Sequence, residues 1–141
     1  MIRFSRVAMG ALVAALVSVS AAQAQNVTMR ATLNGAQEVP AVTTQGNGTA
    51  TLTFNPANRE LSYEVTYSGL GGPATAGHIH CCAAAGANAG VAVPFASPAS
   101  PIRGTATLNE AQATALMAGQ MYVNIHTAAN GGGEIRGQIT R

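Results

Sequence analysis

Apolar and polar side chains alternate along several short segments of the chain, which is the pattern of β-strands with one buried face. Every second residue is apolar in residues 27–33, 49–54 and 61–67, and threonine is frequent between the apolar positions. Residues 55–58, Asn-Pro-Ala-Asn, are typical of a turn. The second and third segments are therefore predicted to form a hairpin.

Three further strands are predicted at residues 75–82, 91–95 and 102–108. Pro94 and Pro98 interrupt the middle one, and proline favours a position at the edge of a sheet because it has no backbone N–H to donate. The residues between the first two of these segments are small and rich in glycine, so they are predicted to form a loop.

One helix is predicted over residues 111–118. Asn109 is a suitable N-cap, with Gln112 three residues later and Glu110 in the first turn, where the helix dipole favours a negative charge. Gly119 can end the helix in a left-handed conformation.

The last two strands are predicted to form an antiparallel hairpin in which Ile125 pairs with Ile135. This register directs four polar side chains outward in two facing pairs: His126 with Glu134, and Asn124 with Arg136. Glu134 and Arg136 are then most simply a surface ion pair. About eight short strands and one short helix predict an all-β fold, a Greek-key β-sandwich or a flattened barrel.

The three histidines of the chain are its main chemical feature. His78, His80 and Cys82 occupy alternate positions of one predicted strand, so they share its outer face. If this strand lies beside the one that carries His126, three imidazoles converge near a thiol. Nitrogen and sulfur ligands favour copper or zinc over calcium or magnesium. Glu134 would then hold the His126 ring in its ligating orientation. The alternative is that the histidines only bond loop backbone at the surface.

The adjacent Cys81 and Cys82 leave several alternatives open. Neighbouring Cα atoms lie about 3.8 Å apart across a trans peptide, which is below the usual disulfide range. A vicinal disulfide, thiolate ligands for a soft metal and an intermolecular bridge all remain, as does a role as small buried residues. Alternation places Cys81 inward and Cys82 near the histidines.

Residues 1–24 have the features of a secretory signal peptide. Arg3 and Arg6 precede an apolar run over residues 7–19, and Ala22-Gln23-Ala24 fits the cleavage rule. The run is shorter than the roughly 20 residues of a membrane span. We therefore expect a periplasmic or secreted protein without a membrane span after cleavage; a retained anchor is the alternative.

The charged residues and the motifs of the predicted domain, residues 25–141, limit the classes of partner and reaction that we expect. The net charge of +2 belongs to the leader, because five arginines and five glutamates balance in the rest. No basic stripe remains for nucleic acid or anionic lipid. The domain has no Asp, no Gly-x-Ser-x-Gly motif and no phosphate-binding loop, which favours a binding protein over an enzyme.

Several short motifs occur in a characteristic order along the domain: Leu33-Asn34-Gly35, Glu38-Val39-Pro40, residues 61–70, Gly77-His78-Ile79-His80, Gly119 with residues 122–127, and residues 133–139. With these motifs the chain resembles the CHRD domain, a module repeated in chordin and found singly in bacterial exported proteins. The resemblance implies a sandwich-like extracytoplasmic module and little about activity. His78, His80, His126 and Glu134 fall on motif positions, whereas the cysteine pair is typical of some bacterial members only.

Three functions are compatible with these residues. The first is an exported, non-catalytic binding module with copper or zinc at His78, His80 and His126, with or without Cys82. The second is a metal-free interaction or adhesion module whose Glu38-Val39-Pro40 segment and loops bind a protein partner. The third is a copper redox enzyme distantly similar to copper–zinc superoxide dismutase, although that dinuclear site uses an Asp and more than three histidines.

Overall fold

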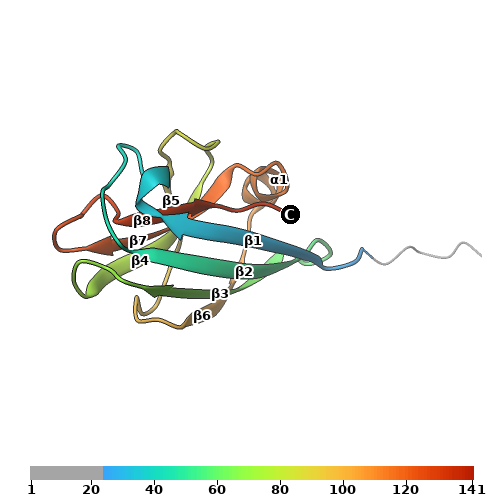
Figure 1. The fold of residues 1–141 in the computed structure, drawn as a ribbon. Coiled ribbons are helices and arrows are strands. Elements are labelled where there is room, and N and C mark those ends of the chain that lie inside the picture. Colours follow the sequence, from blue (N-terminus) through green and yellow to red (C-terminus); the bar gives the residue numbers. More distant parts are fainter. Residues whose placement is uncertain (1–23) are drawn as a thin grey trace, which may run out of the picture.

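The computed structural model describes residues 24–141, most of which lie in or between eight antiparallel strands (Figure 1). The strands are β1 (Val27–Asn34), β2 (Asn47–Asn55), β3 (Glu60–Ser68), β4 (Ala74–Cys81), β5 (Gly90–Pro94), β6 (Ile102–Thr107), β7 (Met121–Thr127) and β8 (Ile135–Gln138). A 3-10 turn, η1 (Gly35–Gln37), follows β1, and one α-helix, α1 (Glu110–Met117), connects β6 to β7. The predicted all-β fold with about eight strands and a single short helix is confirmed.

The eight strands form one sheet in the order β5-β4-β7-β8-β1-β2-β3-β6. The hairpin predicted between residues 49–54 and 61–67 is confirmed, with Phe54 opposite Leu61, and β5 lies at an edge as expected. The sheet curls until its two ends approach, since Tyr63 on β3 contacts Phe95 just after β5 at a ring-centroid distance of 4.9 Å. The result is a nearly closed, flattened barrel.

The alternating apolar residues fill the interior of this barrel. Leu33, Leu52, Val65, Ile79 and Ile125 are completely buried, one from each of five strands. Burying such a side chain stabilises the fold by about 1.5–3 kcal/mol relative to leaving it exposed. One continuous core therefore holds β4 and β7, the strands that carry the histidines, in a fixed position.

The helix has the ends that the sequence predicts. Asn109 and Gln112 form a reciprocal capping box, in which each side chain accepts a hydrogen bond from the other residue's backbone N–H. Gly119 has a φ of +72, the left-handed conformation that ends the helix. Leu116 is completely buried and anchors α1 to the barrel.

The predicted leader, residues 1–24, lies outside the described residues except for its last residue. Within the described region, α1 is too short and insufficiently apolar to cross a membrane.

The outer face of β4, β7 and β8 is more buried than the sequence predicts. The predicted register is confirmed, with Ile125 opposite Ile135 and Asn124 opposite Arg136. Yet Asn124, Glu134 and Arg136 are only 2%, 1% and 1% exposed, so their assignment to a solvent-facing surface is wrong. Strand alternation shows which face a side chain occupies, but it does not show whether a loop crosses that face.

Two loop segments account for this burial. Residues 82–89 bond to Arg136, whose guanidinium donates to Asn88 Oδ1 at 3.1 Å and to the Ala87 carbonyl at 2.7 Å. Residues 38–46 cover the other side, where the Thr44 hydroxyl donates to Glu134 at 2.6 Å. The predicted surface ion pair between Glu134 and Arg136 is therefore replaced by separate, buried hydrogen bonds to these loops.

Candidate metal centre

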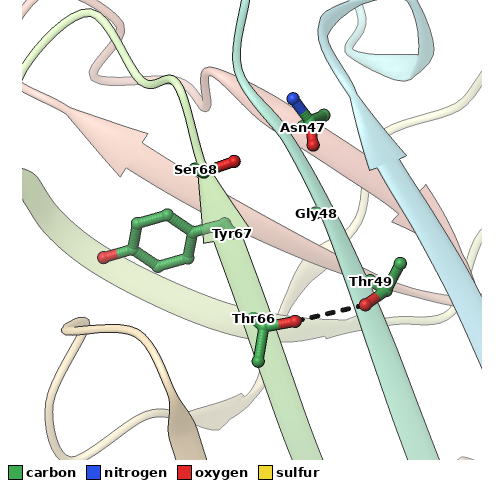
Figure 2. A pocket seen from close by; sticks show the side chains of 6 residues that line it. All are labelled: Asn47, Gly48, Thr49, Thr66, Tyr67 and Ser68. Carbon is green, nitrogen blue, oxygen red and sulfur yellow. Dashed lines mark hydrogen bonds between the residues drawn. The ribbon is translucent and has the colours of Figure 1, made fainter.

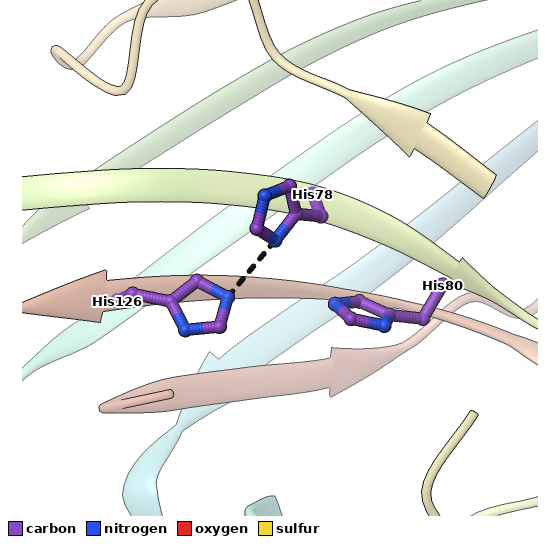
Figure 3. Close-up of side chains that lie close together, drawn as sticks. All are labelled: His78, His80 and His126. Atoms are coloured by element: carbon purple, nitrogen blue, oxygen red, sulfur yellow. Dashed lines mark hydrogen bonds between the residues drawn. The ribbon is translucent and has the colours of Figure 1, made fainter. Parts of the chain in front are cut away.

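The three histidines meet on the outer face of two neighbouring strands. On β4 and β7, Ala76 pairs with His126, His78 with Asn124 and His80 with Tyr122. One ring nitrogen from each histidine lies within 4.8 Å of the other two (Figure 3). β4 and β7 are therefore neighbours, as the predicted convergence of the three histidines requires.

The His126 ring has a defined tautomer. Its Nδ1 lies 3.0 Å from the carbonyl oxygen of Gly131, which can only accept, so Nδ1 carries a proton. In the neutral ring Nε2 then has the free lone pair, and it points to His78 Nδ1 at 3.0 Å (Figure 3). A backbone carbonyl that holds the far nitrogen in this way is the usual support of a metal-binding imidazole.

His80 is held in the same way and is more tightly packed. Its Nδ1 donates to the Ala89 carbonyl at 2.9 Å, while its Nε2 lies 2.9 Å from Asn124 Oδ1. The ring stacks on Tyr122 with centroids 4.7 Å apart and an interplanar angle of 2°. The Arg136 guanidinium carbon also lies 3.4 Å from the centre of the Tyr122 ring. His80 is only 8% exposed, so its position is almost fully determined by packing.

The surroundings keep two of the imidazoles neutral. Burial lowers the pKa of His78, and the neighbouring His126 and His80 lower it further. Burial also lowers the pKa of His126, and His80 lowers it further. The hydrogen bond to Gly131 acts to raise this pKa, but its effect is smaller than that of burial. Neutral imidazoles are the form that binds a metal ion. Because His78 and His126 are partly exposed, an ion can reach the cluster from solvent.

Glu134 is not the partner of His126 that the sequence analysis predicted. Its carboxylate accepts from the hydroxyls of Thr44 and Thr127, at 2.6 and 2.7 Å, and from the Gly71 N–H at 2.8 Å. Burial acts to raise the pKa of Glu134, but these hydrogen bonds outweigh it and leave the pKa below its usual value. Glu134 thus connects the loops of Thr44 and Gly71 to the end of β7, and Gly131 takes the place beside His126.

The cysteines do not join the histidine cluster. Cys81 and Cys82 form a disulfide with each other. Cys81 packs against the core, as alternation predicts, whereas Cys82 is exposed and borders a hollow with Glu110, Ala111 and Thr114 of α1. A disulfide sulfur is not a thiolate, so in this structure the candidate ligands are the three histidines without Cys82.

Two polar residues of this region are not predicted as parts of the site: Asn124, which contacts His80, and Glu38, which lies beside Asn124. Asn124 could have been found, since it lies two residues before His126 on the same face and opposite His78. Glu38 could not, because a loop brings it there from 86 residues earlier in the chain than Asn124. Glu38 is 6% exposed, and its Oε1 has no hydrogen-bond partner of good geometry.

The environment of Glu38 opposes its ionisation. Burial raises the pKa of the carboxyl to about 7, and the positive charge of Arg136 and the amide of Asn124 only partly offset this rise. Glu38 therefore ionises less readily than an exposed glutamate, and its carboxyl lies beside Asn124.

A hollow of about 250 Å³ on the opposite part of the barrel has a different character (Figure 2). Its lining consists of residues from β2 and β3: Asn47, Gly48, Thr49, Thr66, Tyr67 and Ser68. The Thr49 and Thr66 hydroxyls lie 3.2 Å apart and bond to each other. This lining contains no carboxylate, thiol or imidazole, so the histidine cluster is the better candidate for a functional site.

Comparison with known families gives one match, in which the CHRD domain model covers residues 29–139. That range includes all eight strands except the first two residues of β1. Comparisons with curated proteins and with solved structures gave no match.

Proposed function

Because the chain belongs to the CHRD domain family and brings three histidines together, we propose that it is an exported binding module that holds a copper or zinc ion through His78, His80 and His126. The convergence of the three imidazoles carries the proposal. Two of them, His80 and His126, direct Nε2 into the cluster because backbone carbonyls hold their Nδ1 atoms. Imidazole ligands without an adjacent carboxylate suit copper and zinc.

The geometry requires only a small adjustment to hold an ion. Ligands of a tetrahedral zinc ion, with bonds of about 2.0–2.1 Å, lie about 3.3 Å from one another. The His78 and His126 nitrogens are 3.0 Å apart, close to this spacing. The widest separation in the cluster is 4.8 Å, so the rings have to close by roughly 1.5 Å.

Metal titration of the untagged protein tests this proposal. Calorimetry with Zn(II) and, with a competing chelator, Cu(II) should give one ion per chain. His78→Gln should weaken binding by at least about 10-fold, since it removes a ligand but keeps a hydrogen-bonding side chain. Thr66→Ala, on the opposite hollow, is the matched control and should leave affinity unchanged. Absence of binding in the wild type, or equal binding by His78→Gln, contradicts the proposal.

Export is supported by the leader-like residues and by the disulfide. Arg3, Arg6 and the Ala22-Gln23-Ala24 site are those of a signal peptide, and disulfides persist mainly in oxidising compartments. Expression of the full chain in a bacterium, followed by cell fractionation and N-terminal sequencing, should find an extracytoplasmic protein that begins at Gln25. Recovery in the cytoplasm with residues 1–24 retained is the contrary result.

A metal-free interaction module is the second candidate, and one observation favours it. Each histidine already has a hydrogen-bond partner within the protein, so the cluster is satisfied without an ion. On this alternative the histidines fasten the loops that cover β4 and β7, and the loops bind a protein partner. The titration above separates the two functions, because this candidate requires no bound metal.

A further inference from the structure

We propose that Asn124 is a fourth ligand of the metal ion and binds it through Oδ1. This inference rests on the proposed histidine site and adds an oxygen to its three nitrogens. The sequence places Asn124 on the same strand face as His126. Its place among the three histidines is what the structure adds.

Asn124 lies at the centre of the cluster. It is the direct partner of His78 across the two strands and stands two residues before His126 on β7. His80 stands two residues after His78 on β4, so it lies diagonally across from Asn124. All four side chains therefore share one face, and Asn124 neighbours each of the three histidines. Its side chain is only 2% exposed, so it is confined to this position.

The distance from Asn124 to His80 is that of two ligands of one ion. Asn124 Oδ1 lies 2.9 Å from His80 Nε2, and His78 Nδ1 lies 3.0 Å from His126 Nε2. Tetrahedral ligands of zinc are separated by about 3.3 Å. The four atoms thus form two closely spaced pairs, and an ion between the pairs completes a four-coordinate site.

The orientation of the Asn124 amide is determined by its other neighbours. Nδ2 donates to the Gly132 carbonyl at 3.4 Å. The Glu38 carboxyl lies on the same side, since Glu38 Oε1 and Asn124 Nδ2 both occupy the space that a side chain at Gly133 would enter. A carbonyl and a carboxylate both attract the amide N–H groups, so they hold Nδ2 on their side. The oxygen is left facing His80. Glu38 is thus a positioning residue for the proposed ligand.

This ligand set indicates which ions the site prefers. Three imidazoles and one amide oxygen suit Zn(II) or Cu(II), whereas Cu(I) favours thiolate and thioether ligands. Since the described cluster contains no sulfur, we expect divalent ions to bind more tightly than Cu(I).

The competing explanation is that Asn124 Oδ1 only accepts a hydrogen bond from an Nε2–H of His80, so that this nitrogen has no lone pair for a metal ion. The two explanations give opposite results for Asn124→Leu, which has a similar size and no oxygen. If Asn124 is a ligand, the variant should bind Zn(II) at least about 10-fold more weakly. If it only blocks His80, removing it should leave the affinity unchanged or raise it. Asn124→Asp retains the oxygen and should bind at least as tightly as the wild type.

The experiment is a Zn(II) titration of the wild type, Asn124→Leu, Asn124→Asp and His78→Gln, each first compared by urea unfolding without metal. Unchanged or tighter binding by Asn124→Leu, with His78→Gln weakened, overturns the role of Asn124 while leaving the histidine site intact. Absence of binding by the wild type overturns both. If Asn124→Leu does not fold, the wild-type NMR resonances decide: the Asn124 side-chain carbonyl carbon should shift on Zn(II) addition, and no shift overturns the assignment.

Discussion

The chemistry of the cluster is decided by the positions of individual protons. His126 donates through Nδ1 to the Gly131 carbonyl, so a loop atom rather than an acidic side chain selects its tautomer, whereas each ring nitrogen of His80 faces an oxygen acceptor. The sequence identified the three histidines and their shared face, because alternation along a strand depends only on the spacing of residues. It did not identify the supporting carbonyls, because every residue has a backbone carbonyl. Only the path of the loop determines which carbonyl lies beside a histidine.

Acid should destabilise the metal-free protein through His78 and His126. Both pKa values lie below the ordinary 6.5 in the folded state, so folding favours the neutral rings. This contribution is fully present above pH 6.5 and is lost as pH falls through the lowered folded values. Urea unfolding in the presence of a chelator measures this effect. Between pH 7.5 and 5, the free energy of unfolding should fall less for a His78→Gln/His126→Gln variant than for the wild type. Parallel curves would contradict the lowered pKa values.

Glu38 should have the opposite effect on stability. Its pKa is raised from 4.5 to about 7 in the fold, so its contribution is fully present below pH 4.5 and is lost as pH rises through about 7. Glu38→Gln, which cannot ionise, should therefore gain stability relative to the wild type between pH 4.5 and 8, on the order of 1–3 kcal/mol. The difference between the two unfolding free energies at each pH measures this gain. A difference that does not change with pH would show that Glu38 ionises normally.

At the scale of elements, the strands could be predicted from the sequence, but the loops that cover their outer face could not. The β2–β3 and β7–β8 hairpins follow from alternation and turn residues, and α1 follows from the capping box at Asn109. The segments over residues 38–46 and 82–89 have no periodic pattern, yet they bury Glu134 and Arg136. Alternation alone places these two residues on the surface, because it does not distinguish an outward position from an exposed one.

Gly133, in the β7–β8 turn, tests this packing. Its φ is +128, which disfavours other residues, and a Cβ there would overlap Glu38 Oε1 and Asn124 Nδ2. Gly133→Ala should lower the free energy of unfolding by at least about 2 kcal/mol and weaken metal binding, because it displaces Asn124.

Gly132→Ala is the matched control for this prediction. A Cβ at Gly132 meets nothing within 4 Å, so its effect on stability should stay within about 0.5 kcal/mol. Equal effects of the two substitutions, measured by urea unfolding, would show that Glu38 and Asn124 do not fill the space beside Gly133.

At the scale of the whole molecule, the exposed half of the disulfide, Cys82, lies beside α1 and apart from the histidine cluster. The alternation of β4 placed Cys82 with the histidines, but the strand ends at Cys81 and Cys82 borders α1 instead. The all-β barrel and the histidine-bearing face were predictable because they depend on strand pattern. The path of the chain beyond the end of a strand was not.

This separation predicts that the cysteines are dispensable for metal binding. A Cys81→Ser/Cys82→Ser variant, and the wild type after reduction of the disulfide, should both bind one Zn(II) ion with an affinity within about twofold of the oxidised protein. Zinc calorimetry on all three forms measures this. An affinity that rises strongly after reduction, and only where the cysteines are present, would instead make the thiols ligands.

The most direct test of the account is anomalous diffraction from crystals of the protein loaded with Zn(II), recorded on both sides of the zinc absorption edge. The account predicts one peak on the outer face of β4 and β7, about 2.0–2.1 Å from one ring nitrogen each of His78, His80 and His126. Saturated crystals with no peak there, or with zinc bound only at other positions, would contradict it and leave the histidines as supports for the loops.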